Sequence, residues 1–465
     1  MRDLGAPPCG VITARARDEL RASHKRKNGR FSHFSSSPSA ALSPLPAYSL
    51  FLPLPSMAAF VASAGCSRVG APAARLSTAR HASPVPVRVP AARRLSTGLR
   101  MVAPSPSKEE QFVCADESPM TLTRYFMGKA NEQLDEEHVQ DLQNLMASIQ
   151  MACKKIASLV SRAGITNLTG YEASGSINVQ GEEQKKLDVL SNDVLKHALK
   201  WRGGKLGIIA SEEEDEPIMV DELASGNYIA VFDPLDGSSN IDAGIATGTI
   251  FGIFAESAGC LASDWEAKVD QEVLTCLQNV LQPGSNLVAS GYCMYSSSCM
   301  MVLTTGSGVQ GFTLDPQIGE FVLTHPSITI PSRGKIYSVN EANEPAWDPV
   351  LRSYIASLKD GSNSSGMTYS SRYIGSMVAD VHRTLMYGGL FAYPADKRNA
   401  NGKLRLLYEC SPMSYLIEQA GGIATTGRER VLDVIPSSVH QRVPLVLGSP
   451  EDVQELLDKY YEASL

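Results

Sequence analysis

The chain has 465 residues, of which 42 are Lys or Arg and 49 are Asp or Glu, so its formal net charge is −7. This acidic balance argues against a nucleic-acid-binding protein, and the sequence contains no run of eighteen or more uncharged apolar residues that could cross a membrane. Its nine cysteines form no C-x-x-C pair and no zinc-type spacing with histidine, so a metal site built on sulfur is not expected.

Charge is divided unevenly along the chain. Residues 1–101 carry fifteen Lys or Arg against three acids, a net charge of +12, so the remaining 364 residues carry −19. Residues 57–101 hold seven arginines and no acid among many Ala, Ser, Pro and Val, which is typical of an organelle transit peptide. We interpret residues 1–101 as a disordered extension and transit peptide. The alternative, a basic tail for nucleic acid, is disfavoured because no aromatic residues alternate with the basic ones.

Beyond residue 110 the sequence has the pattern of a folded protein with helices and strands in mixed order. Helical spacing of apolar residues predicts helices at Glu137–Arg162, Glu182–Leu199 and Met377–Met386. Short apolar runs predict strands at Leu206–Ala210, Tyr228–Phe232, Gly248–Phe254, Val302–Thr305, Gly311–Leu314 and Leu404–Tyr408. This order indicates a layered α/β fold, and no internal repeat interrupts it.

Two predicted strands run directly into acidic residues. Leu206–Ala210 is followed by Ser-Glu-Glu-Glu-Asp, and Tyr228–Phe232 is followed by Asp-Pro-Leu-Asp-Gly-Ser-Ser. Mg²⁺ prefers hard oxygen ligands and is usually held by a few carboxylates together with a substrate phosphate. Five acids that converge without a cation would repel one another, which calls for a metal ion.

The second acidic segment has the features of a turn for metal and phosphate. Pro234 restricts the backbone, which helps to aim Asp233, the Leu235 carbonyl and Asp236 at one point. The amides of Gly237, Ser238 and Ser239 can then hold phosphate oxygens. A solvated loop is the better interpretation of residues 212–216 taken alone, whereas two acids around a proline before a Gly-Ser-Ser turn favour function.

These motifs resemble the class I fructose-1,6-bisphosphatases of the inositol-monophosphatase-like superfamily. The resemblance begins at Thr121 and continues to the C-terminus. It rests on Lys185-Lys-Leu-Asp188, Ser211-Glu-Glu, Asp233-Pro-Leu-Asp-Gly-Ser-Ser-Asn-Ile-Asp242, Arg372-Tyr-Ile-Gly-Ser-Met-Val-Ala-Asp-Val-His-Arg383 and Lys403-Leu-Arg-Leu-Leu-Tyr-Glu-Cys410. It implies a layered α/β/α/β/α sandwich with a metal-binding half over residues 110–330 and a substrate-binding half over residues 331–465.

The resemblance also implies roles for individual residues in a magnesium-dependent hydrolysis of the 1-phosphate of fructose 1,6-bisphosphate. Two or three Mg²⁺ ions are expected, with the water positioned and deprotonated by Glu213 and Asp188. Glu182 stands where the family often has Asp on a catalytic loop. The implied metal ligands are Glu212, Asp233, the Leu235 carbonyl, Asp236 and Glu409. The implied substrate contacts are Asp236, Gly237, Ser238, Ser239, Asn340, Arg372, Tyr373, Tyr393 and Lys403. In the family the arginine matching Arg372 comes from a neighbouring subunit, so a homo-oligomer, a tetramer, is expected.

A cysteine-bearing segment suggests redox control. Residues 255–281 resemble an insertion of plastid-type members of the family, in which a disulfide is reduced by thioredoxin. The resemblance implies a Cys260–Cys276 disulfide, an f-type thioredoxin partner, a place in the plastid stroma and a role in the Calvin cycle. In a reducing compartment the alternative is that both cysteines act as small apolar residues.

Two other functions compete with this interpretation. A sedoheptulose-1,7-bisphosphatase is the nearest alternative within the superfamily, although Tyr408-Glu-Cys-Ser-Pro-Met413 and the helix from Met377 look like the fructose enzyme. A catalytically inactive homologue used for binding is the alternative from another class. It would be expected to lack some of the metal ligands, and every matched ligand is present here.

Overall fold

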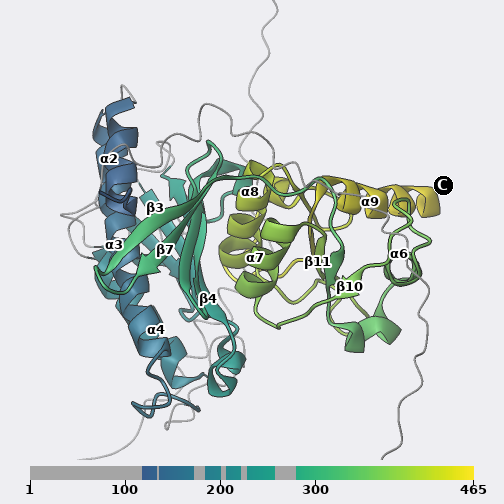
Figure 1. The fold of residues 1–465 in the computed structure, drawn as a ribbon, viewed down its shortest axis with the longest axis horizontal. Helices are drawn as coiled ribbons and strands as arrows, with labels where there is room; N and C mark the ends of the chain where they lie inside the picture. The colour runs from purple at the N-terminus through teal and green to yellow at the C-terminus, as the bar shows by residue number, and fades with distance from the viewer. Residues whose placement is uncertain (1–117, 133–135, 172–183, 201–205, 221–227, 257–278) are drawn as a thin grey trace, which may run out of the picture. The chain divides into compact units, whose positions relative to one another are not determined.

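A computed structural model describes residues 118–465, except residues 133–135, 172–183, 201–205, 221–227 and 257–278 (Figure 1). The chain divides into two units, Met1–Leu99 and Arg100–Leu465, and the description below concerns the second unit. The predictions for residues 1–101, for Glu182, and for Cys260 and Cys276 lie outside the described residues.

The first sheet contains eight strands among the described residues, in the order β2-β1-β3-β4-β5-β6-β7-β8. Only β1 and β3 run parallel, and every other neighbouring pair is antiparallel. The strands are β1 (Leu206–Ser211), β2 (Ile218–Met219), β3 (Tyr228–Asp236), β4 (Thr247–Ala255), β5 (Leu287–Tyr295), β6 (Cys299–Thr304), β7 (Val309–Asp315) and β8 (Glu320–Ile328).

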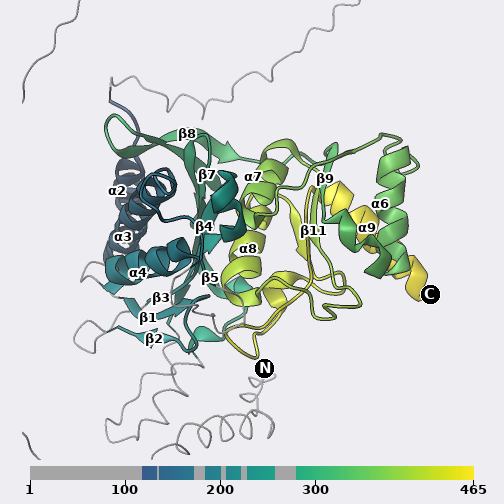
Figure 2. The same cartoon turned by 90° about the horizontal axis from the view of Figure 1, so that it is seen from below.

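Three helices cover one face of this sheet, namely α2 (Leu122–Glu132), α3 (Glu136–Val160) and α4 (Lys186–Lys200) (Figures 1 and 2). Strand β3 illustrates why its sequence is continuously apolar: Ala230 and Phe232 face the three helices, whereas Ile229 and Val231 lie in a separate core on the other face. A strand that is covered on both faces does not alternate between apolar and polar residues.

A second sheet of five strands has the order β10-β9-β11-β13-β12. Its strands are β9 (Ile336–Ser338), β10 (Ser370–Ser371), β11 (Leu390–Tyr393), β12 (Ile423–Thr425) and β13 (Leu445–Gly448). Helices α7 (Met377–Tyr387) and α8 (Ser411–Gln419) lie between the two sheets, and α6 (Pro349–Asp360) and α9 (Pro450–Ser464) cover the outer face of the second sheet (Figure 2). The layers therefore follow the order α/β/α/β/α, as predicted.

Two predictions of secondary structure are wrong in detail. Helix α4 begins at Lys186 and not at Glu182. The predicted strand Leu404–Tyr408 is instead occupied by a π-helical turn, η6 (Leu406–Cys410), in which the Cys410 amide donates to the Arg405 carbonyl at 2.9 Å. A short apolar run looks the same in a buried strand and in a buried helical turn, and this run is buried between the two sheets.

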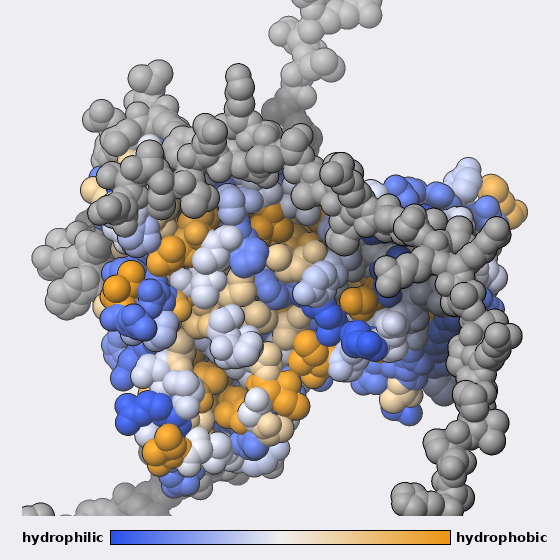
Figure 3. All heavy atoms as spheres, viewed as in Figure 1, coloured by the Kyte–Doolittle hydropathy of each residue, from blue (hydrophilic) through white to orange (hydrophobic). Residues whose placement is uncertain are grey.

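Among the helices of the described residues, none combines the length and apolarity that crossing a membrane requires. The face seen in Figure 3 carries apolar residues over the first sheet, whereas the part over the second sheet is largely hydrophilic.

Candidate active site

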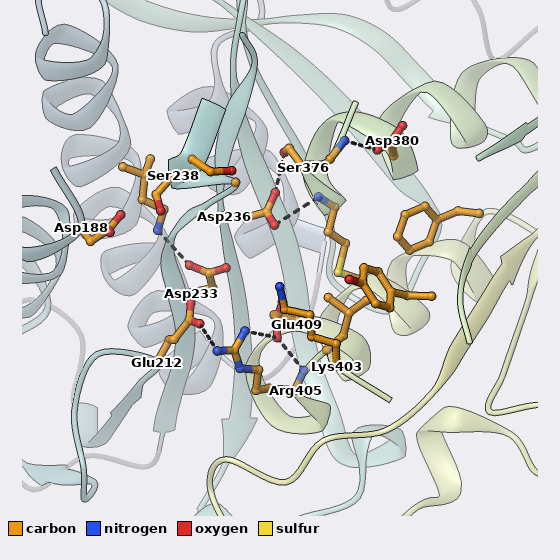
Figure 4. A pocket seen from close by; sticks show the side chains of 18 of the residues that line it. Asp188, Glu212, Asp233, Asp236, Ser238, Ser376, Asp380, Lys403, Arg405 and Glu409 are labelled. Atoms are coloured by element: carbon orange, nitrogen blue, oxygen red, sulfur yellow. Dashed lines mark hydrogen bonds and ion pairs between the residues drawn. The ribbon is translucent and has the colours of Figure 1, made fainter. Parts of the chain in front are cut away.

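A pocket of about 250 Å³ collects most of the residues assigned to the site from the sequence. It is lined on one side by the ends of β1 and β3 and on the other by α7, β11 and η6 (Figure 4). The predicted site residues that line it are Asp188, Glu212, Glu213, Asp233, Leu235, Asp236, Gly237, Ser238, Ser239, Tyr373, Tyr393, Lys403 and Glu409.

The end of β3 and the turn that follows it are fixed by a hydrogen bond and by a glycine. Asp233 Oδ1 accepts from the Leu235 amide at 2.9 Å within β3, whose pairing with β4 shifts register between Asp233 and Asp236. The residues around the proline, predicted as a tight turn, are therefore an irregular end of the strand. Gly237 has a φ of 73°, a left-handed conformation that other residues adopt only at a cost. A Cβ at this position would lie 2.7 Å from the Cβ of Ser376, so the turn and the start of α7 approach as closely as a glycine allows.

Asp236 is held at the N-terminus of α7. Its carboxylate accepts from the Ser376 hydroxyl at 2.5 Å, the Met377 amide at 3.1 Å and the Val378 amide at 2.9 Å. These backbone amides have no partner within the helix, and the helix dipole favours a negative charge beside them. Two segments about 140 residues apart in the sequence are thereby joined at the pocket.

Glu409 enters the pocket from the π-helical turn η6. Its Oε2 atom accepts from the Arg405 amide at 2.6 Å, so the side chain folds back over the start of its own turn. The guanidinium of Arg405 lies 3.0 Å from Glu212 Oε1 and 3.9 Å from Glu409 Oε2. Arg405 is only 5% exposed, so it is a buried cation placed between two carboxylates.

Asp233, Asp236 and Glu409 form a buried cluster in which each residue offers one oxygen, all within 4.8 Å of one another. Burial, together with repulsion from the neighbouring carboxylates, raises the pKa of Asp233 well above its ordinary value. Burial likewise raises the pKa of Asp236 to about 6 and that of Glu409 to about 8, although hydrogen bonds and Arg405 oppose the shifts. Carboxylates held this close and this deep fit a divalent cation, which would remove their mutual repulsion.

A second group of acids lies beside this cluster. Burial, with additional repulsion from Glu213 and Glu212, raises the pKa of Asp188 to about 7. The Lys185 amide donates to Asp188 Oδ2 at 2.9 Å, and Gln184 Nε2 donates to Glu213 Oε2 at 2.5 Å. Asp188 therefore has a proton affinity suited to exchange near neutral pH.

Two predicted substrate contacts lie outside this pocket. Asn340 lines a smaller neighbouring hollow together with Tyr393, and its side chain accepts from the Ala342 amide at 3.2 Å. Arg372 is exposed, with Nη1 donating to the Ser371 carbonyl at 2.8 Å. The structure thus joins Tyr373, Tyr393 and Lys403 with the carboxylates and leaves Asn340 and Arg372 apart from them.

Several residues of the pocket were not identified from the sequence. Ser376 binds Asp236 directly, and Asp380 accepts from the amides of Ile374 and Gly375, both at 3.0 Å, which shapes the turn before α7. Arg405 supplies the buried positive charge. Ser376 and Asp380 lie within the motif from Arg372 to Arg383, and Arg405 lies in the motif that ends at Cys410, so the resemblance marked their neighbourhood without giving them roles.

Comparison with known proteins agrees with the fold. Residues 120–326 match the family model described as Fructose-1-6-bisphosphatase, N-terminal domain, and residues 330–461 match that of the C-terminal domain. The chain is 55% identical over 337 residues to a chloroplastic fructose-1,6-bisphosphatase of Triticum aestivum, covering 72% of this chain and 80% of the relative. It is 56% identical over 341 residues to one of Brassica napus, covering 73% and 81%.

A solved structure gives the same result. The crystal structure of Leishmania major fructose-1,6-bisphosphatase in holo form matches with a TM-score of 0.66 and 42% identity, covering 74% of this chain and 99% of that one. The two family models together extend across both sheets, and the curated relatives and the solved structure each cover more than two thirds of the chain, so the chain belongs to the fructose-1,6-bisphosphatase family.

Proposed function

We propose that this chain hydrolyses the 1-phosphate of fructose 1,6-bisphosphate in a magnesium-dependent reaction that yields fructose 6-phosphate and phosphate. The observation that carries the proposal is the arrangement of three buried carboxylates, Asp233, Asp236 and Glu409, beside the turn of residues 237–239. Family membership and the names of the relatives support the substrate.

The metal ligands would be Glu212, Asp233, the Leu235 carbonyl, Asp236 and Glu409. A donor set of hard oxygens suits Mg²⁺ better than softer metals, and repulsion among the carboxylates favours cation binding. When bound, Mg²⁺ ions would stabilise charge on the phosphate and on the departing sugar oxygen and would make a water more acidic.

The residues around the cluster would orient the substrate and move protons. The amides of Gly237, Ser238 and Ser239 would hold phosphate oxygens in line with the attacking water. Asp188 and Glu213 would position that water, and Asp188 would accept its proton as the new phosphorus–oxygen bond forms. The bond from phosphorus to the sugar O1 would break at the same time, and O1 would take up a proton from solvent to become the 1-hydroxyl of fructose 6-phosphate, while Asp188 returns its proton to solvent. Glu182, which precedes α4 in the sequence, would assist Asp188 and Glu213.

The rest of the substrate would be recognised away from the carboxylates. Lys403, Tyr373 and Tyr393 line the same pocket and offer the donors that the sugar and the second phosphate require. Asn340 would extend this region through the hollow that it shares with Tyr393, and Arg372 would act in the site of a neighbouring copy of the chain. The proposed assembly is a homotetramer, and the apolar residues gathered over the first sheet support an interface (Figure 3).

A disulfide between Cys260 and Cys276 would control activity in the plastid stroma, where an f-type thioredoxin would reduce it for the Calvin cycle. The chloroplastic relatives support this location. Strand β4 connects the proposed switch to the site, because it ends at Ala255 before the cysteine-bearing segment. Its Ile250 and Gly248 pair with Asp233 and Asp236 of β3. Changing either Cys260 or Cys276 to Ser should give an enzyme active without dithiol, and unchanged dithiol activation in both variants would exclude this pair.

The proposed activity is tested by phosphate release from fructose 1,6-bisphosphate, with and without Mg²⁺, after dithiol treatment. We expect rapid release that depends on Mg²⁺. Faster turnover of sedoheptulose 1,7-bisphosphate at equal concentration would reassign the substrate. No release from either sugar would indicate the inactive homologue.

A further inference from the structure

One histidine joins the two elements that carry Glu212 and Glu409. His440 lies in the loop before β13, and its Nε2 atom is 3.0 Å from the carbonyl oxygen of Glu214, two residues after Glu212. Its Nδ1 atom is 2.8 Å from the hydroxyl of Tyr408, the residue before Glu409. The imidazole therefore spans from the loop after β1 to the turn η6.

The chemistry of the three groups determines which atom donates in each hydrogen bond of this bridge. A carbonyl oxygen can only accept, so the proton must lie on Nε2 of His440. Burial lowers the pKa of His440, which favours the neutral ring. In a neutral imidazole the other nitrogen is an acceptor, so the Tyr408 hydroxyl donates to Nδ1. Each of the three groups thus has one defined role in the chain of hydrogen bonds.

Both ends of the bridge are anchored. The Glu214 side chain accepts from Asn192 Nδ2 at 2.8 Å and from Lys196 Nζ at 2.5 Å, which ties the loop after β1 to helix α4. Tyr408 is fully buried and makes an edge-to-face contact with the imidazole, with ring centroids 5.8 Å apart. A connection between two fixed elements can set their separation, whereas one made to a loose loop cannot.

The backbone that carries His440 is fixed as well. Val439 is 5% exposed and packs in the same core as Tyr408 and Ile208 of β1. The Leu406 amide donates to the Gln441 carbonyl at 2.7 Å, so the loop runs beside the segment that leads into η6.

We propose that His440 is a positioning residue that holds the Glu212 loop and the Glu409 turn at the separation required for a divalent cation. The inference rests on the proposed function, because it assumes that Glu212 and Glu409 are metal ligands. His440 touches neither carboxylate, and it acts through the backbone of Glu214 and the hydroxyl of Tyr408. Without it, the two ligands would still be linked through Arg405, but the Glu212 loop and the Glu409 turn would lose the hydrogen bonds that fix their separation.

The test compares variants that keep an aromatic ring at each position and remove the hydrogen bonds. Tyr408→Phe removes one hydroxyl, and His440→Phe removes both nitrogens. Mn²⁺ binding is measured by electron paramagnetic resonance without substrate, and Mg²⁺ activation is measured in the assay of phosphate release. We expect the half-saturating concentrations of both metals to rise about ten- to a hundredfold in each variant. The KM for sugar bisphosphate at saturating Mg²⁺ should change less than twofold. The double variant should be no worse than His440→Phe alone, because both changes break the same connection.

A second tyrosine–histidine pair supplies the matched control. Tyr292 Oη lies 2.7 Å from Nδ1 of His382, also with ring centroids 5.8 Å apart, but His382 does not connect two ligand-bearing elements. Tyr292→Phe should therefore lower thermal stability without changing metal affinity.

Three results would overturn the inference. The first is a change of less than twofold in Mn²⁺ affinity in both Tyr408→Phe and His440→Phe. If His440→Phe does not fold, the result for Tyr408→Phe alone decides the test. The second is an equal shift in Tyr292→Phe, which would indicate general destabilisation. The third is the absence of Mn²⁺ binding and Mg²⁺-dependent hydrolysis in the unaltered enzyme. This last result would show that the proposed function itself had failed, whereas the first two would leave it standing.

Discussion

Replacing Asp236 by Asn separates the structural role of this residue from its role in metal binding. Asp236 accepts three hydrogen bonds at the start of α7. An amide retains one acceptor oxygen, so either the Met377 or the Val378 N–H would face an NH₂ group, at a cost of about 1–3 kcal/mol. Removal of the buried charge has a stabilising effect of similar size. Burial raises the pKa of Asp236 from 3.8 to about 6, so above pH 6 the ionised carboxylate lowers the free energy of unfolding by about 3 kcal/mol relative to a neutral side chain.

The two effects nearly cancel, so metal-free Asp236→Asn at pH 8 should unfold within about 2 kcal/mol of the unaltered protein. A cation at a hundred times its dissociation constant should stabilise the unaltered protein by about 2.7 kcal/mol, and the variant should lose this gain. Turnover should fall by several powers of ten, because a proposed direct metal ligand has been removed. Thermal unfolding with and without Mg²⁺, together with phosphate release, measures both. A variant that keeps its Mg²⁺-dependent stabilisation and near-normal turnover would refute the reasoning.

Three further predictions concern the turn, a partly buried histidine and an exposed arginine. Gly237→Ala should lower the free energy of unfolding by about 1–3 kcal/mol and reduce kcat more than tenfold, because its Cβ would press on Ser376. Gly319→Ala is the control, because Gly319 has a similar φ of 70° with open space around it. This change should lower the free energy of unfolding by about 1 kcal/mol and leave kcat unchanged. Equal kcat in Gly237→Ala and Gly319→Ala would contradict this account. Burial lowers the pKa of His382 from 6.5 to about 4, so the unfolded chain binds more protons between these values and stability falls as the pH drops below 6.5. Between pH 7.5 and pH 4.5, the free energy of unfolding of His382→Gln should fall by about 2.5 kcal/mol less than that of the unaltered protein. Denaturant unfolding measures both decreases, and identical decreases would argue against this cause. Arg372→Ala should raise the KM for fructose 1,6-bisphosphate at least tenfold with little change in kcat, and an unchanged KM in steady-state kinetics would remove Arg372 from the substrate site.

Sequence patterns predicted best where local chemistry determines local structure. The apolar run before Asp233 becomes strand β3, although the strand continues through the proline to Asp236, where a tight turn was predicted. The glycine after it adopts the left-handed conformation that a sharp change of direction needs. Glu212, Asp233 and Asp236 line one pocket because β1 and β3 are parallel neighbours whose carboxyl ends meet, a pairing that the sequence did not reveal. The predicted α/β/α/β/α layers came from the family resemblance, and the structure has them.

Contacts between distant segments could not be predicted in the same way. Ser376 meets Asp236 across about 140 residues, and no periodic pattern encodes that pairing. Arg405 looks like one polar residue in an apolar run, and its role as a counterion is evident only once Glu212 lies beside it. The strands of the second sheet are only two to four residues long, too short for alternation to be recognised.

The π-helical turn at Leu406–Cys410 has a consequence for how this region tolerates insertions and deletions. Its hydrogen bond closes over five residues, and α8 follows without a break from Ser411. Deleting one residue before Glu409 would allow an ordinary α-helical turn and would carry the glutamate about 100° around the helix axis, away from the pocket. Conservative substitutions among the apolar members of the turn would leave that angle intact. We therefore expect lineages of this enzyme to vary the apolar residues Leu406, Leu407 and Cys410 of this turn far more readily than its length.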